Sequence, residues 1–155
     1  MLPTLLYCMK KIRINAEIYA QEGRACHVTI CSFDAQPIFT NDAFTVHCMK
    51  LLESLCHKYG IFIYAYCFMP DHLHTVISVR GGKSIIDLVR AFKSKATIDS
   101  RRYGYQGRIY QPRFYDHFAR TMKDLENEIN YILLNPVRKG LAAEIGDYPY
   151  SRWFV

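Results

Sequence analysis

Residues 61–79 read IFIYAYCFMPDHLHTVISV, and this stretch decides the fold. Two apolar runs, rich in aromatic and β-branched residues, flank the turn sequence at 69–71. Such a pattern predicts a β-hairpin with strands at 61–68 and 73–79. The hairpin gives the chain the centre of an antiparallel sheet, around which the other elements can be arranged.

His72 and His74 lie at the start of the second predicted strand, on either side of Leu73. Because side chains alternate between the two faces of a strand, both histidines point to one side and Leu73 points into the core. Two neighbouring imidazoles are half of a metal site. Two surface histidines on an exposed strand face would give the same spacing, so the pair needs a second observation.

Working outward from the hairpin, the chain alternates strands and helices. We expect strands at 25–33 and 113–120 and helices at 41–59, 84–101 and 123–134. This order predicts an α+β fold, the ferredoxin-like split-βαβ sandwich, whose antiparallel sheet carries helices on one face and a further C-terminal helix. A chain of 155 residues fits a single domain spanning 1–155.

The last predicted helix supplies the second observation. Its apolar stripe consists of Leu125, Ile129, Ile132 and Leu133. Pro136 is expected to end the helix by displacing Asn135 from helical geometry. Tyr131 and Asn135 are four residues apart, so a phenol and an amide oxygen lie on the same side and can approach one point. Taken singly, Tyr131 also fits an aromatic residue at the rim of the core, and Asn135 fits a helix C-cap.

The net charge of +6 favours a polyanionic partner such as nucleic acid. The basic residues form groups at Lys10-Lys11-Ile12-Arg13, Lys93 with Lys95, Arg101-Arg102 and Arg138-Lys139. Tyrosine and phenylalanine residues between 103 and 115 lie among them, and basic groups interleaved with aromatic rings are typical of single-strand binding. We predict that the DNA-contacting residues are Gln111, Arg113, His117, Arg101, Arg102, Arg138 and Lys139. A solvated basic surface is the alternative.

Six cysteines occur without a CxxC pair, most of them within apolar patterns, which indicates buried thiols in a reducing compartment. No apolar run approaches the length of a membrane span. The apolar residues at 1–7 precede the basic group at 10–13, which is the reverse of the order in a signal peptide. We therefore expect a cytoplasmic protein.

The motifs taken together resemble a known family. They are HLH at 72–74, YILLNPVRKGL at 131–141, HVTI at 27–30, YQPRFYDH at 110–117 and YPYS at 148–151. In their order along the chain, these motifs are similar to those of the HUH single-tyrosine transposases of the insertion-sequence-200 type, and most of all to those of the REP-associated tyrosine transposases. The resemblance extends from about residue 13 to residue 151. The chain departs from the family pattern at two positions. Tyr110 replaces the usual Trp. Asn135 stands where insertion-sequence members carry Gln, and the REP-associated branch has Asn at this position.

The resemblance implies a metal-dependent endonuclease and strand transferase that acts on single-stranded DNA at hairpin-flanked sites. Tyr131 would be the nucleophile and would form a 5′-phosphotyrosine. His72, His74 and Asn135 would bind a divalent cation, Mg²⁺ or Mn²⁺, of which Mn²⁺ suits two imidazoles better. Monomer and homodimer both remain open. The alternative is a non-catalytic single-stranded nucleic-acid-binding module of the RNA-recognition type, because one fold serves many functions.

Overall fold

The computed structural model describes residues 15–155, so the basic group at 10–13, Cys8 and the apolar start of the chain lie outside the described residues. The hairpin forms as predicted. Strands β2 (Ile61–Met69) and β3 (His72–Val79) pair in antiparallel fashion from Ile61 opposite Val79 to Met69 opposite His72. Leu73 is fully buried, as its position between the two histidines requires.

Three further strands complete the sheet. They are β1 (Cys26–Cys31), β4 (Tyr115–Phe118) and β5 (Ser151–Trp153), and the strand order is β4-β1-β3-β2-β5 with all pairs antiparallel. The first four strands have the predicted ferredoxin-like arrangement. Strands β1 and β4 are shorter than the predicted ranges, and β5 was not predicted. The three residues of β5 are too few to show the alternation of apolar and polar residues that identifies a strand in sequence. Their pairing with β2 decides their conformation.

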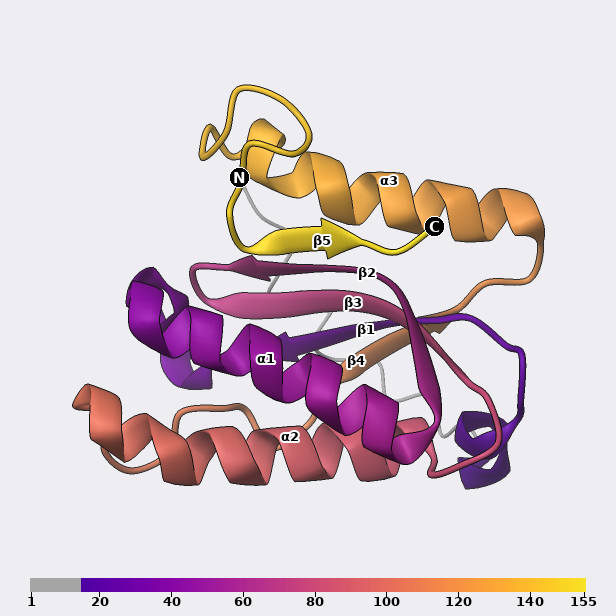
Figure 1. Ribbon diagram of the computed structural model, residues 1–155, viewed down its shortest axis with the longest axis horizontal. Helices are drawn as coiled ribbons and strands as arrows, with labels where there is room; N and C mark the ends of the chain where they lie inside the picture. The colour runs from indigo at the N-terminus through magenta and orange to yellow at the C-terminus, as the bar shows by residue number, and fades with distance from the viewer. Residues whose placement is uncertain (1–14) are drawn as a thin grey trace.

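Helices α1 (Asp42–Tyr59) and α2 (Ile85–Ser100) cover one face of the sheet, as Figure 1 shows. The predicted boundaries of α1 are confirmed: Asn41 Oδ1 accepts from the Phe44 amide at 2.9 Å, and Gly60 ends the helix with a left-handed φ of 65°. The main core lies between these helices and the sheet. Its helical members include Phe44, Cys48, Leu52, Ile85, Leu88, Val89, Phe92 and Ala96.

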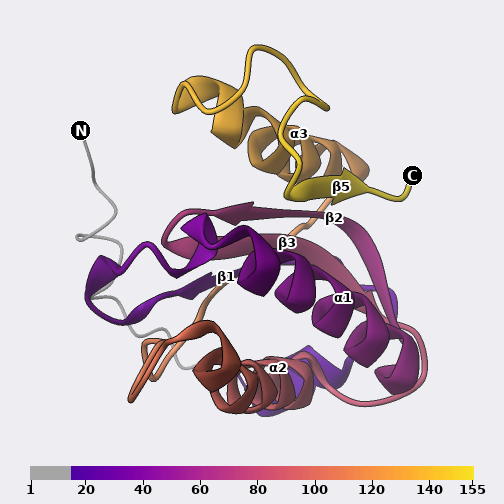
Figure 2. The same ribbon diagram turned by 60° about the vertical axis from the view of Figure 1, so that its left-hand side comes forward.

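Helix α3 (Met122–Arg138) covers the opposite face of the sheet, which Figures 1 and 2 show from two directions. Leu125 and Ile132 pack there in a second, smaller core that also holds Met69 and Val76. Residues on the β-strands that point away from the main core therefore face α3.

The predicted end of α3 is wrong, because the helix runs through Pro136 to Arg138. A proline in a helix removes its own amide hydrogen bond and crowds the carbonyl four residues back, but it leaves the amides of the later residues free to bond. The amides that follow still find acceptors: the Lys139 amide donates to Asn135 O at 3.1 Å and the Leu141 amide to Pro136 O at 2.8 Å. Asn135 is consequently an interior helical residue, and the helix C-cap is Lys139.

Cys26, Cys31, Cys48, Cys56 and Cys67 are free thiols, and all of them except Cys31 are buried. Burial raises the pKa of Cys48, Cys56 and Cys67 to about 12, so these thiols are unreactive at neutral pH. Among residues 15–155, no helix combines the length and apolar character needed to cross a membrane.

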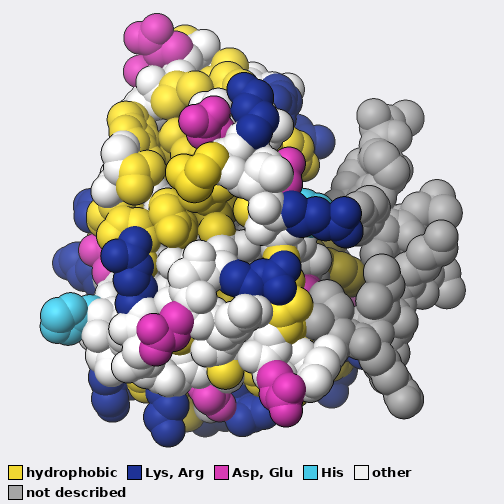
Figure 3. Space-filling view, turned by 90° about the vertical axis from the view of Figure 1, so that its right-hand side faces the viewer, with side chains coloured by type: hydrophobic (Ala, Val, Ile, Leu, Met, Phe, Trp, Pro, Cys, Tyr) yellow, Lys and Arg dark blue, Asp and Glu magenta, His cyan; other side chains and the backbone are white. Residues whose placement is uncertain are grey.

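Apolar side chains gather on the face seen in Figure 3, the side towards which the last residues of the chain run in Figure 1. The large exposed apolar residues at this end of the chain are Trp153, Phe154 and Val155. Trp153 ends β5, which forms one edge of the sheet, and Phe154 and Val155 follow it.

Candidate active site

The predicted histidine pair forms on the α3 face of the sheet. His72 Nε2 and His74 Nε2 lie 3.0 Å apart, and the two rings meet edge to face with centroids 4.6 Å apart. The pair stands where the sheet register puts it, with His74 opposite Thr29 and His72 opposite Cys31 of β1. The strand alternation thus brings both Nε2 atoms to one point.

A carboxylate contacts one histidine of the pair, and burial sets the charge of the other. Asp71 Oδ1 accepts from His72 Nδ1 at 2.6 Å, and this hydrogen bond lowers the pKa of Asp71, with Lys139 adding a smaller effect. His74 is 7% exposed. Its burial, together with the neighbouring His72 and His27 rings, holds the pKa of His74 well below its usual range. His74 is therefore neutral at neutral pH and keeps a nitrogen lone pair, as a metal ligand must.

The pair fits a divalent cation. Two nitrogens at right angles on an octahedral ion, each about 2.1 Å from it, are about 3 Å apart, which matches the Nε2–Nε2 distance. Within the described part of the chain, no group of three or more His, Cys, Asp or Glu side chains is arranged to hold a metal. Any further ligand would be an amide, a water or a DNA phosphate, and this suits Mg²⁺ or Mn²⁺ better than zinc.

Tyr131 lies beside the histidines although it comes from a different element. Its ring centroid is 5.8 Å from that of His74 and 6.0 Å from that of His27. The residue is 45% exposed, so its hydroxyl group is open to a substrate. Tyr110, a rival candidate in the basic stretch, is buried and packs against Phe39 and Phe92. Tyr131 is therefore an exposed tyrosine whose ring lies beside that of His74.

Asn135 lies one helical turn beyond Tyr131 and is 6% exposed. Its side-chain amide makes no hydrogen bond with the described residues, unlike that of a capping residue. The neighbouring Lys139 lies close enough to Asp71 to lower its pKa, so this end of α3 borders the histidine pair. The role of Asn135 as third ligand stays a prediction.

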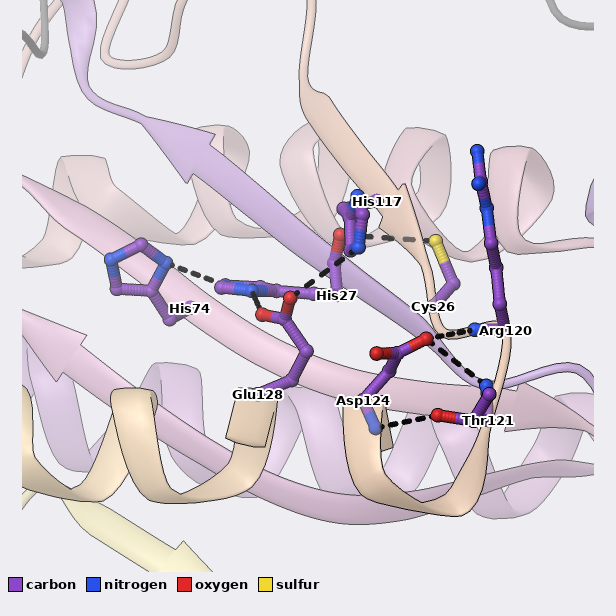
Figure 4. A network of polar contacts seen from close by, with 8 residues as sticks. All are labelled: Cys26, His27, His74, His117, Arg120, Thr121, Asp124 and Glu128. Carbon is purple, nitrogen blue, oxygen red and sulfur yellow. Dashed lines mark hydrogen bonds and ion pairs between the residues drawn. The ribbon is translucent and has the colours of Figure 1, made fainter. Parts of the chain in front are cut away.

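Sequence reasoning missed two residues that complete this surface, His27 on β1 and Glu128 on α3. Figure 4 shows the His27 ring between His74 and Glu128. His27 Nε2 is 2.9 Å from His74 Nδ1, and its Nδ1 is paired with the Glu128 carboxylate. Glu128 precedes Tyr131 by three residues, and this spacing on one helix face was the signal that could have identified it.

A groove of about 600 Å³ opens beside these groups, between α3 and strands β1 and β4. Its lining residues are His27, Thr29, Cys31, His74, Tyr115, Asp116, His117, Asn127, Glu128 and Tyr131. Polar groups line one concave surface together with an exposed phenol, which is the arrangement expected of a binding site. Burial raises the pKa of Asp116, whose carboxylate accepts from the Tyr19 hydroxyl at 3.1 Å.

The residues predicted to contact DNA do not all gather at this groove. Arg138 and Lys139 follow Tyr131 on α3, and His117 lines the groove itself. Arg101 and Arg102 directly follow α2, in a short 3-10 helix at Arg101–Tyr103, and α2 covers the opposite face of the sheet.

Gln111 and Arg113 lie on the segment that leads into β4, and Gln111 Oε1 is 3.5 Å from the Tyr115 hydroxyl. Lys93 holds this segment by donating to the carbonyls of Gln111 and Pro112. The basic residue Lys93 is thus already engaged within the fold.

Comparisons with known proteins identify the family of the chain. Residues 20–132 match the family model described as "Transposase IS200 like". A Haemophilus influenzae protein that carries the name of a REP-associated tyrosine transposase is 30% identical over 110 residues, covering 64% of this chain and 62% of that protein. The REP-associated tyrosine transposase of Escherichia coli is 31% identical over 90 residues, covering 57% and 52%. The chain thus spans less than two thirds of the length of either relative.

Solved structures show the same fold. A REP-associated tyrosine transposase bound to a REP hairpin superposes with a TM-score of 0.72 at 23% identity, covering 92% of this chain and 82% of that one. A Deinococcus radiodurans protein described as a transposase gives a TM-score of 0.54 at 17% identity, covering 80% and 95%. The family model covers well over half of the residues, including the histidine pair and Tyr131. The chain therefore belongs to the IS200-like transposase family.

Proposed function

We propose that this chain is a metal-dependent endonuclease and strand transferase for single-stranded DNA at hairpin-flanked sites. The observation that carries the proposal is the meeting of two elements: the pair of imidazoles on β3, whose Nε2 atoms lie 3.0 Å apart, and the exposed Tyr131 ring on α3, 5.8 Å from His74. A module that only bound nucleic acid would need neither the pair nor an exposed phenol beside it.

The strand-cleavage step uses the Tyr131 hydroxyl as the nucleophile. Its oxygen forms a bond to the scissile phosphorus while the bond from phosphorus to the 3′-oxygen breaks, which gives a 5′-phosphotyrosine and a free 3′-hydroxyl. The phenol loses its proton and the departing 3′-oxygen gains one. The reverse step joins strands without ATP, because the phosphotyrosine ester retains the energy of the original phosphodiester.

His72 and His74 would hold the cation, and Asn135 would complete the protein ligands. When bound, Mg²⁺ or Mn²⁺ would act as a Lewis acid on the scissile phosphate and orient it. Arg138 lies beside the Tyr131 ring and supplies positive charge for a phosphate there.

Hairpin DNA is the proposed partner, since a structural neighbour was solved bound to a REP hairpin. The net charge of +6 suits such a partner. Single-stranded DNA next to the hairpin would lie in the groove between α3 and β4, where Tyr115 and His117 face it.

The proposal is tested by incubating the protein with labelled single-stranded hairpins and Mn²⁺ and searching for a covalent protein–DNA band on a denaturing gel. We expect an adduct with the full-length chain and none with Tyr131→Phe, which keeps the ring and removes only the hydroxyl. Tyr103→Phe is the matched control, since Tyr103 does not line the groove, and it should still form the adduct. Peptide mass spectrometry should place the phosphonucleotide on residue 131. An adduct on another tyrosine, or hairpin binding with no cleavage under any divalent cation, would favour the non-catalytic binding module.

A further inference from the structure

Three imidazoles lie in a row on the α3 face, and a carboxylate stands at each end. Asp71 Oδ1 contacts His72 Nδ1 at 2.6 Å, and Glu128 is paired with His27 Nδ1. Between these ends, His72 Nε2 faces His74 Nε2 at 3.0 Å, and His74 Nδ1 faces His27 Nε2 at 2.9 Å. We call His72, His74 and His27 the imidazole row.

The sheet register builds this row from distant parts of the chain. On β1, Thr29 lies opposite His74, and His27 lies two residues before Thr29 on the same face of the strand. Thr29 Oγ1 also approaches His74 Nδ1, at 3.0 Å. Glu128 reaches His27 from α3, 101 residues away in sequence. The contacts of the imidazole row therefore depend on the tertiary fold. The Glu128 carboxylate lies at the His27 end of the row, and Asp71 lies at the His72 end.

The two carboxylates fix the direction of the hydrogen bonds. An ionised carboxylate only accepts, so His72 and His27 both donate to their carboxylates from Nδ1. A neutral imidazole carries a single N–H, which leaves Nε2 of each ring as a lone pair. The Nε2 lone pair of His27 can then accept from Nδ1–H of His74. In that tautomer His74 Nε2 is a lone pair too, and it points at His72 Nε2.

We propose that His27 and Glu128 are positioning residues for the metal ligand His74. Glu128 holds His27 as the Nδ1–H tautomer, and His27 in turn holds His74 with Nε2 open towards His72. The inference rests on the proposed function, because it concerns the cation that His72 and His74 would bind. A hydrogen-bonded partner behind a metal-binding histidine fixes both its tautomer and the orientation of its ring.

The surroundings of His27 and Glu128 favour the hydrogen bond between them. The His27 side chain is 10% exposed and that of Glu128 is 21% exposed, so water competes little for their hydrogen bond. The second oxygen of Glu128 faces His117 Nε2 at 3.6 Å. The hydrogen bond from His27 lowers the pKa of Glu128, so the carboxylate stays an acceptor.

The first measurement is the affinity of the DNA-free protein for Mn²⁺, determined by calorimetry or electron paramagnetic resonance. We expect Glu128→Gln and His27→Gln to weaken Mn²⁺ binding by about 10- to 100-fold, whereas His72→Ala abolishes it. The matched controls are the exposed residues Glu126→Gln, on the same helix, and His57→Gln, on α1. Both controls should bind Mn²⁺ like the unmodified chain.

The second measurement separates positioning from mere cross-linking of β1 to α3. Long-range ¹H–¹⁵N spectra of the Zn²⁺-loaded protein report which nitrogen of each histidine carries the proton. We expect Nδ1–H on His27 in the unmodified chain and a mixture of tautomers in Glu128→Gln. A purely structural pair would lower thermal stability without moving this signal. If His27→Gln does not fold, Glu128→Gln still decides the question.

The outcomes distinguish this inference from the proposed function. An unmodified chain that binds no Mn²⁺ overturns the metal-dependent function and the positioning role with it. Normal Mn²⁺ binding that neither His27→Gln nor Glu128→Gln alters overturns the positioning role alone. Loss of binding in His27→Gln as complete as in His72→Ala, with Glu128→Gln unchanged, would make His27 a ligand itself and also overturn it.

Discussion

The guanidinium carbon of Arg138 lies 5.2 Å from the centroid of the Tyr131 ring, two helical turns further along α3. A cation over an aromatic face at this distance contributes about 0.5–1 kcal/mol at an exposed site. The contact keeps a positive charge beside the phenol before any DNA is present. A phosphate that approaches Tyr131 therefore meets Arg138 as well.

We predict that Arg138→Gln weakens hairpin binding and reduces the slope of log affinity against log salt by about one, as expected for the loss of one phosphate contact. Fluorescence anisotropy at several salt concentrations measures both quantities. Lys123→Gln is the control, since Lys123 is an equally exposed cation at the opposite end of α3. Equal salt slopes for Arg138→Gln and the unmodified chain would contradict the assignment.

The imidazole of His72 should matter for cleavage and not for DNA affinity. His72→Ala removes one of the two Nε2 atoms that face each other at 3.0 Å, while the phosphate contacts that dominate affinity lie elsewhere. We expect cleavage to be lost and hairpin affinity to change by less than about threefold. Cleavage and anisotropy assays on the same preparation measure the two effects. Undiminished cleavage by His72→Ala in metal-free buffer would contradict the assignment of His72 as a metal ligand.

Asn135 is expected to be the third protein ligand. Asn135→Ala should weaken Mn²⁺ affinity by about 10- to 100-fold, and Asn135→Gln, which keeps an amide oxygen, should recover much of it. Asn130→Ala is the control because Asn130 is an exposed amide on the same helix. If Asn135→Ala binds Mn²⁺ normally, the site consists of the two histidines with water and phosphate oxygens.

Local patterns predicted most of the fold and the first half of the site. The hairpin at 61–79 and the paired histidines followed from alternation, which depends only on neighbouring residues. The caps of α1 followed from Asn41 and Gly60 for the same reason. Tyr131 was found through the family motif, and the structure adds that its ring centroid lies 5.8 Å from that of His74.

The remaining features depend on contacts between distant residues. Helix α3 continues past Pro136 because the amides of Lys139 and Leu141 donate to backbone carbonyls. Residue propensities alone do not predict these hydrogen bonds. The pairing of His27 with Glu128 requires both the register of β1 against β3 and the docking of α3 on the sheet. The spacing of Glu128 from Tyr131 places Glu128 on that helix face, but local sequence does not place His27 beside it.

The carboxylate of Asp99 is predicted to make the stability of the fold depend on pH. Its side chain is 2% exposed, and it accepts from His47 at 2.8 Å and from Lys95 at 3.0 Å. Burial alone would raise the pKa of Asp99, but the hydrogen bonds and charges of Lys95 and His47 lower it below the usual value. A group whose pKa is lower in the folded state stabilises that state above its unfolded pKa, and the contribution is lost as the pH falls through the folded value.

Asp99→Asn should therefore reduce the free energy of unfolding by about 1.5–3 kcal/mol at about pH 7, the range for a hydrogen bond to a charged group. The difference from the unmodified chain should shrink as the pH falls below about 4, where an unfolded aspartate takes up its proton. Urea denaturation at about pH 7, 5 and 3 measures it, with the exposed Glu126→Gln as control. A destabilisation by Asp99→Asn that stays constant across this range would mean that shape and hydrogen bonding, and not the charge of Asp99, hold the end of α2 against α1.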